Sequence, residues 1–397
     1  MAEAAGAPPI LLARLRSVSP SSAELLRLCP LRAILAGSRG TEPFVLGNPK
    51  AWLGTAYHRV MEGIASAAQR GDPASGARML WDDAVRELWQ DAQSHPLNHR
   101  FGPPETWPGY HLALAGAMLH CQEISPGQHL DAPGREGWHP DQILREQYLT
   151  AMAGKLVGRP DRVARREVTD YKSGGIYEDR SATEVKASYI RQLRLYAYLV
   201  RQNYGYWPEK GVLVPMLGAK VEIELAPSAC ESEAAEAVSL LGAANAMLPS
   251  AGDAARLANP SPKSCGYCPY KIICPVFWQA AQPEWSGPLR QACLEGRLTA
   301  PPSTVHGGAA ASVEIDVDRG AAPEGHEVIA PLSSRIHPCL AGDWHEGERV
   351  RFTGLALRPD GRPGTCSLTV CARVRDLPEL RVAPADADSL AVSPDGA

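Results

Sequence analysis

Long apolar runs are missing from this chain of 397 residues. A helix that spans a bilayer needs about 18 to 20 consecutive apolar residues, and no segment approaches that length. The early apolar segment at residues 10–13 is also far shorter than the core of a secretory signal. We therefore expect a cytoplasmic protein with no membrane partner.

A strong excess of either charge is missing as well, because 40 Lys and Arg stand against 44 Asp and Glu. A nucleic-acid partner must then be held by a local basic patch rather than by the overall charge. Hydrophobic residues make up 45% of the chain and charged residues 21%, values that exclude a wholly disordered protein. The chain also lacks a Walker A loop, a helix-turn-helix and a C₂H₂ finger, so an ATP-driven motor would have to be a separate chain.

The first two thirds of the chain predict an α/β fold. Helical periodicity appears at residues 54–68, 73–93 and 111–123, after a flexible Ala/Pro-rich leader at 1–16. Three β-prone runs follow at 146–151, 156–163 and 167–172, and a helix at 182–203 precedes strands at 211–215 and 220–225. A strand, a helix and a strand after a meander indicate a mixed central sheet flanked by helices.

The last third predicts a separate small all-β domain. Residues 279–310 are rich in Pro, Ala, Gly and Ser and are expected to form a linker. Alternating runs then predict an all-β domain over 311–382, for which an OB barrel is one candidate, and a disordered tail over 383–397. An OB barrel would bind single-stranded DNA through stacking aromatics, and Trp344 and Phe352 are the candidates.

Two carboxylates and a lysine lie in neighbouring β-prone runs. Asp161 follows Gly158-Arg159-Pro160, and Asp170-Tyr171-Lys172 ends the next run. Asp170 and Lys172 share one face of a strand, and Asp161 can approach them across adjacent strands. Two carboxylates and a backbone carbonyl, here that of Tyr171, suit Mg²⁺ or Mn²⁺, and the lysine would stabilise charge on a phosphoryl group. The alternative interpretation is a surface hairpin with ordinary charges. Lysine is scarce here, with eight among the 40 basic residues, which favours the functional interpretation.

Three cysteines are clustered at the spacing of metal ligands, and a fourth lies far earlier in the chain. Cys265, Cys268 and Cys274 are clustered late in the chain, and Cys29 precedes Pro30 near its start. In a reducing compartment such clusters bind metal more often than they form disulfides. Four thiolates can hold a 4Fe–4S cluster or a tetrahedral Zn²⁺, and the spacing does not separate the two.

These motifs together resemble those of the PD-(D/E)XK nuclease superfamily over about residues 17–278. Pro160-Asp161 followed by Asp170-x-Lys172 resembles its signature, in the form found in the RecB nuclease family. Two further motifs are similar to that family's G-x-x-x-H and Q-x-x-x-Y and occur in its order: Gly54 to His58, and Gln192 to Tyr196. The resemblance implies that His58 is a further metal ligand, and that Gln192 and Tyr196 touch the substrate or brace the site.

One early and three late cysteines resemble the iron–sulfur branch of the family, which includes the AddB nuclease and the CRISPR-associated nuclease of the same type. The resemblance favours a 4Fe–4S cluster over zinc. Such a cluster would clasp the N-terminal helix to the end of the nuclease domain. The resemblance also implies a Mg²⁺- or Mn²⁺-dependent deoxyribonuclease, an exonuclease on single-stranded or free-ended DNA. Repair, recombination, CRISPR and antiviral defence are its possible pathways, with a helicase or CRISPR-adaptation protein as partner.

Basic residues are concentrated around the acidic motif. From residue 155 to 201, eleven Lys or Arg outnumber six Asp or Glu. Arg191, Arg194 and Arg201 share a helix with Gln192, and we expect them to bind phosphates, although a solvated helix face is the alternative. Glu146, on the strand before Asp161, is a further candidate for the site, but we expect it to be a solvated edge charge. Two other functions stay open: a catalytically silent DNA-binding or assembly subunit, and a zinc-stapled structural protein.

Overall fold

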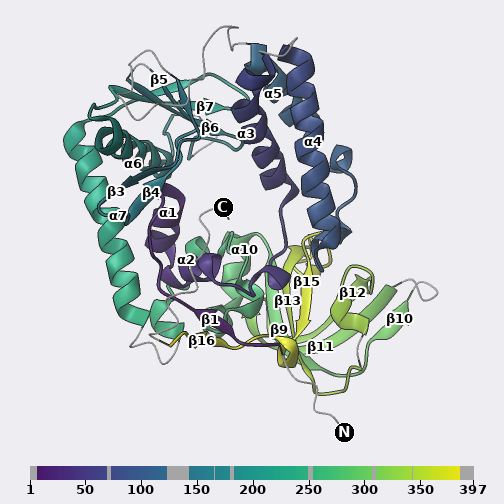
Figure 1. The fold of residues 1–397 in the computed structure, drawn as a ribbon. Coiled ribbons are helices and arrows are strands. Elements are labelled where there is room, and N and C mark those ends of the chain that lie inside the picture. Colours follow the sequence, from purple (N-terminus) through teal and green to yellow (C-terminus); the bar gives the residue numbers. More distant parts are fainter. Residues whose placement is uncertain are drawn as a thin grey trace.

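The computed structural model describes residues 7–68, 73–122, 143–164, 166–178, 183–248, 254–305, 310–341 and 343–384. The predicted disordered tail falls almost wholly outside these residues. Figure 1 shows an α/β part, which carries the central sheet, and an all-β part. No helix within the described ranges is both long and apolar enough to cross a membrane.

The central sheet has five strands in the order β2-β5-β6-β7-β8. They are β2 (Leu144–Arg145), β5 (Arg162–Ala164), β6 (Glu167–Lys172), β7 (Lys210–Pro215) and β8 (Val221–Glu224). Only the β6–β7 pairing is parallel, and the helix α6 (Ala187–Tyr204) makes the crossover between these two strands. The prediction of a mixed sheet flanked by helices is confirmed.

Helices cover both faces of this sheet because side chains alternate between the faces along each strand. On one face α6 packs with α1 (Pro20–Leu28) and α7 (Pro227–Met247) over Val168 and Leu213. On the other face α3 (Pro49–Ala68), α4 (Pro73–Ser94) and α5 (Tyr110–Gln122) pack over Tyr171, Val212 and Val214. The sheet therefore lies between two helical layers.

The predicted run at 156–163 is divided into two strands, and the predicted run at 146–151 forms a strand only over residues 149–151. Besides β2 and β5, the chain forms a separate two-stranded ribbon of β3 (Leu149–Ala151) and β4 (Leu156–Gly158). The breaks fall at residues 146–148 and 159–161, and Glu146 has a φ of 49°. A positive φ at a residue other than glycine is uncommon and has no signal in the apolar pattern, so the sequence predicted continuous strands.

The all-β part is a half-barrel of β9 (Ala292–Leu298), β10 (Ser303–Val305), β11 (Ala310–Ala321), β12 (Gly325–Leu332), β13 (Arg349–Leu357), β14 (Pro363–Gly364) and β15 (Val370–Arg373). Its main spatial order is β12-β11-β9-β13-β15. The predicted linker at 279–310 is therefore wrong, because β9 is the central strand of this sheet. Because the flanks of β9 are rich in Pro and Ser, the sequence pattern did not indicate a strand there. It did not indicate the short helices α9 (Pro275–Ala280) and α10 (Ser286–Leu289) either.

The candidate stacking aromatics lie in the half-barrel core. Phe352 is fully buried and Trp344 nearly so, and both pack with residues such as Leu294. The Trp344 ring nitrogen donates to the Cys339 carbonyl. Neither ring can stack on a base from this position, so that expectation is wrong.

Part of the predicted leader is a strand. β1 (Ile10–Leu12) pairs in parallel with β16 (Leu380–Val382), and Ile10 and Leu12 are buried. Three residues are too few for a recognisable periodicity, and the partner strand lies at the other end of the chain. The flexible leader predicted for 1–16 is thus corrected at residues 10–12.

Arg100 joins the two parts of the molecule beside the end of α4. Arg100, in the short helix η2 (Asn98–Arg100), donates to the backbone carbonyls of Thr369 and Ile336 in the all-β part. Figure 1 shows α4 running from the α/β part toward β15. The helical layer that covers one sheet face is therefore anchored on the half-barrel.

Candidate active site

Three acidic residues meet at one edge of the central sheet. β2 ends at Arg145, β5 begins at Arg162 and β6 ends near Lys172, so these strand ends lie together. Continuing the observed register places Glu146 opposite Asp161, and Asp161 opposite Asp170. Adjacent strands are about 4.8 Å apart. The row therefore concentrates negative charge in a small space.

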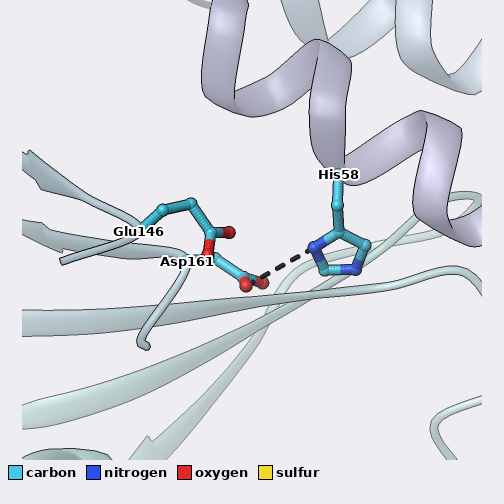
Figure 2. Close-up of side chains that lie close together, drawn as sticks. All are labelled: His58, Glu146 and Asp161. Carbon is cyan, nitrogen blue, oxygen red and sulfur yellow. Dashed lines mark ion pairs between the residues drawn. The ribbon is translucent and has the colours of Figure 1, made fainter. Parts of the chain in front are cut away.

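The helix α3 brings a histidine to this row. His58 Nδ1 lies 3.4 Å from Asp161 Oδ1, and Figure 2 shows the ring directed from the helix toward Asp161 and Glu146. One ligand atom from each of His58, Glu146 and Asp161 falls within 4.8 Å of the other two. An imidazole nitrogen with two carboxylates is a donor set that suits Mn²⁺ or Mg²⁺.

Gly54 explains how α3 comes close enough to the strand ends for His58 to reach Asp161. A Cβ built at Gly54 would lie 2.5 Å from Ser173 Oγ, in the loop that follows Lys172. Glycine therefore lets the helix pack against this loop. His58, about one helical turn further along, is then placed over the strand ends.

Glu146 was expected to be a solvated edge charge, and this expectation is wrong. Its carboxylate belongs to the ligand group. Burial, followed by repulsion from Asp161, raises the pKa of Glu146 to about 8. A bound cation would offset both effects, so the group fits a metal site. The cross-strand register could have placed Glu146 opposite Asp161 from the sequence. It could do so only if the position of the strand breaks was known.

A chain of polar contacts fixes the lysine. Lys172 Nζ lies 2.5 Å from Asp170 Oδ2 and donates to Gln192 Oε1 at 2.7 Å. Gln192 Nε2 in turn donates to Asp170 Oδ1 at 3.3 Å and to the Tyr196 hydroxyl at 3.1 Å. Asp170 is 2% exposed, and burial raises its pKa to about 6 although Lys172 opposes the shift. Gln192 and Tyr196 therefore brace the Asp170–Lys172 pair.

Asp161 is fixed by a backbone contact. Its Oδ2 accepts a hydrogen bond from the Tyr171 N–H. In a strand the N–H and the carbonyl of one residue point toward the same neighbour, so the Tyr171 carbonyl faces the same edge. Its role as a metal ligand stays a prediction.

A family model for the PD-(D/E)XK nuclease superfamily matches residues 17–275. The chain belongs to this superfamily. A comparison with curated proteins found no match. Membership of the PD-(D/E)XK superfamily indicates a nuclease that cleaves phosphodiester bonds with divalent metals. The match begins before α1 and ends just after Cys274, so it includes the acidic row and all four clustered cysteines.

Not every predicted phosphate-binding residue of this PD-(D/E)XK chain is available. Arg191 forms a bidentate pair with Glu24 of α1, with both nitrogen–oxygen distances at 2.6 Å. Arg201 donates to the Gly205 carbonyl at the end of α6, and Arg194 is half-buried. The guanidinium of Arg191 therefore fastens α6 to α1, which corrects the expectation that it meets a phosphate.

The four clustered cysteines of the PD-(D/E)XK part line one cavity: Cys29, Cys265, Cys268 and Cys274. Backbone N–H groups of Asn259 and Phe277 point at the sulfurs of Cys29 and Cys274, at 3.5 and 3.4 Å. Burial raises the pKa of Cys274 to about 12, and the other three sulfurs add to the shift. Buried thiolates that accept such hydrogen bonds are stable only beside a cation, so the donor set fits a metal centre.

Proposed function

We propose that this chain is a metal-dependent deoxyribonuclease that hydrolyses phosphodiester bonds from single-stranded or free DNA ends. The observation that carries the proposal is the convergence of His58, Glu146 and Asp161 with the Asp170–Lys172 pair at one sheet edge. Mg²⁺ or Mn²⁺ held there would polarise the phosphoryl group and activate a water molecule.

The chain's own residues would orient the reacting groups and stabilise the charge that develops on the phosphoryl oxygens. Lys172 is held by Asp170 and Gln192, so its ammonium group is fixed in one direction. A fixed cation lowers the energy of negative charge that develops on the phosphoryl oxygens, because it needs no reorganisation during the reaction. His58 and Asp161 hold each other in position across the edge.

The first test is degradation of end-labelled single- and double-stranded DNA with Mg²⁺ or Mn²⁺. We expect Lys172→Ala and Asp161→Ala each to lower the rate at least about a hundredfold while the fold is retained. Arg166→Ala is the matched control, because Arg166 is exposed at the opposite end of β6 and pairs with Glu209. If the wild type binds DNA but cuts neither substrate with either metal, the assembly-subunit alternative replaces the nuclease.

We further propose that the four cysteines hold a 4Fe–4S cluster. Tetrahedral zinc, with Zn–S bonds of about 2.3 Å, keeps its sulfurs about 3.8 Å apart. No three of the four cysteine sulfurs, all in described residues, fall within 4.8 Å of one another. This wider spacing, inside one cavity, supports a cluster with several irons.

The cluster proposal is tested by colour and metal content. Protein purified without oxygen should be brown and contain about four irons and four sulfides per chain. A colourless protein with one zinc per chain would contradict it. Such a cluster needs reduced thiols, which fits a cytoplasmic protein.

The proposed biological role is DNA repair, recombination or antiviral defence, beside a helicase or CRISPR-adaptation partner. Co-purification of a tagged chain from its own cells, followed by identification of the bound proteins, tests the proposal. Recovery of the chain alone would argue against a stable partner.

A further inference from the structure

An exposed aromatic and cationic pair lies beside the ligand group. Tyr148 follows Glu146 by two residues, and Arg159 precedes Asp161 by two. The guanidinium carbon of Arg159 is 6.0 Å from the centre of the Tyr148 ring. Two residues of extended chain cover only about 7 Å, so the pair lies next to the metal ligands.

This pair is not part of the core. Leu149 is opposite Gly158 in the β3–β4 ribbon, and a Cβ at Gly158 would lie 2.8 Å from the Leu199 side chain of α6. That face of the ribbon therefore packs on α6. The next pair outward, Tyr148 and Arg159, lies just beyond the ends of these two strands. Tyr148 is 47% exposed, and Arg159 is exposed too.

We propose that Tyr148 and Arg159 bind the nucleotide next to the scissile phosphate, with the Tyr148 ring stacked on its base and Arg159 near its phosphate. This inference rests on the proposed nuclease function. A tyrosine ring can stack on any base, provided that the base is free of its duplex neighbours. The pair therefore favours single strands or frayed ends without reading their sequence.

The positive charge of Arg159 also offsets the repulsion between the carboxylate row and DNA. A DNA strand is anionic and is repelled by a row of carboxylates that lacks a compensating cation. Arg159 places a positive charge on the side of the row that leads from β2 and β5 into the ribbon. On the β6 and β7 side, a groove lined by residues 173–177 and 215–219 follows Lys172. A strand lying along the edge would meet the pair on one side and this groove on the other.

The test combines protein variants with abasic substrates. Tyr148→Ala should raise KM for single-stranded DNA about tenfold with kcat changed less than twofold, whereas Tyr148→Phe should retain the wild-type KM. In wild type, one abasic nucleotide near the cut should raise KM by a similar factor. Tyr148→Ala should be insensitive to that abasic nucleotide, because the stacking is already lost. Arg159→Gln should also raise KM and flatten its salt dependence, while the control Arg166→Ala should not.

A binding measurement separates this inference from the nuclease proposal. A single-stranded oligonucleotide with 2-aminopurine, mixed with protein and a chelator, reports stacking without cleavage. Fluorescence quenching that depends on Tyr148, in a protein that cuts nothing, would support the stacking and reject the nuclease. A Tyr148→Ala variant that cuts with unchanged KM and keeps its abasic response would overturn the stacking while leaving the nuclease intact.

Discussion

The acidic edge and the cysteine cavity both collect metal-binding side chains from distant parts of the sequence, but their supports differ. The carboxylates lie at the ends of neighbouring strands of one hydrogen-bonded sheet, and one helix adds His58. The cysteines sit at helix ends and in short loops, with Cys29 between α1 and α2 (Pro30–Gly37). The edge is held by the backbone hydrogen bonds of the sheet, whereas the cysteines come from helix ends and loops. On the functions proposed above, the first group serves chemistry and the second serves architecture.

The variant with the largest expected effect tests whether the acidic edge is needed for activity. Glu146→Gln should lower kcat by on the order of a hundredfold, since it removes one charged ligand and keeps the side-chain shape. The melting temperature with chelator present should not fall. A variant with unchanged kcat would remove Glu146 from the site.

The same variant gives a pH dependence of stability. The pKa of Glu146 in the fold, about 8, lies above its ordinary value of 4.5. Its contribution to stability is therefore complete below about pH 4.5 and is lost as the pH rises through 8. Denaturant unfolding with chelator should show that the wild type loses more stability than Glu146→Gln between pH 5 and 9. Parallel profiles would contradict the raised pKa.

The variant with the next largest expected effect tests whether the cysteine cavity contributes to the stability of the fold. Cys274→Ser should lower the melting temperature by on the order of 10 °C and abolish the visible absorbance, because structural metal binding contributes directly to folding. The matched control is Cys366→Ser, an exposed thiol outside the cavity. If Cys274→Ser keeps its melting temperature and loses only activity, the division between chemistry and architecture fails.

The variant with the smallest expected effect tests whether α3 must pack closely on the loop after β6. Gly54→Ala should lower kcat about tenfold, although alanine favours a helix by about 1 kcal/mol over glycine. The added methyl group would meet Ser173, so Gly54→Ala combined with Ser173→Gly should recover most of the activity. Kinetic assays of the two single variants and the double variant measure the coupling. Equal kcat in Gly54→Ala and wild type would show that this close approach is not needed.

The motif residues were predictable because short-range spacing fixes them. Asp170 and Lys172 are two apart on one strand, and Gln192 and Tyr196 are one helical turn apart, so each pair shares a face in any fold that keeps the element. The structure brings both pairs into one hydrogen-bonded chain. The mixed sheet followed from the same local periodicities.

What the sequence did not predict depends on backbone turns and distant partners. Glu146 joins the site through a positive φ that no apolar pattern indicates. Arg191 was expected to meet DNA, but its partner Glu24 is brought near by the packing of α1 on α6. The proline- and serine-rich flanks of β9 predict a linker where the structure has a strand. A local backbone turn, a tertiary ion pair and a strand with polar, proline-rich flanks all lie beyond what local periodicity can indicate.

The parallel pairing of β1 with β16 brings together two segments that are far apart along the chain, since Ile10 lies opposite Leu380. Ile10 and Leu12 also pack in one apolar cluster with Leu31 and Leu257. Because contacts between such distant positions slow folding, we expect this pairing and its cluster to form late when the unfolded chain refolds.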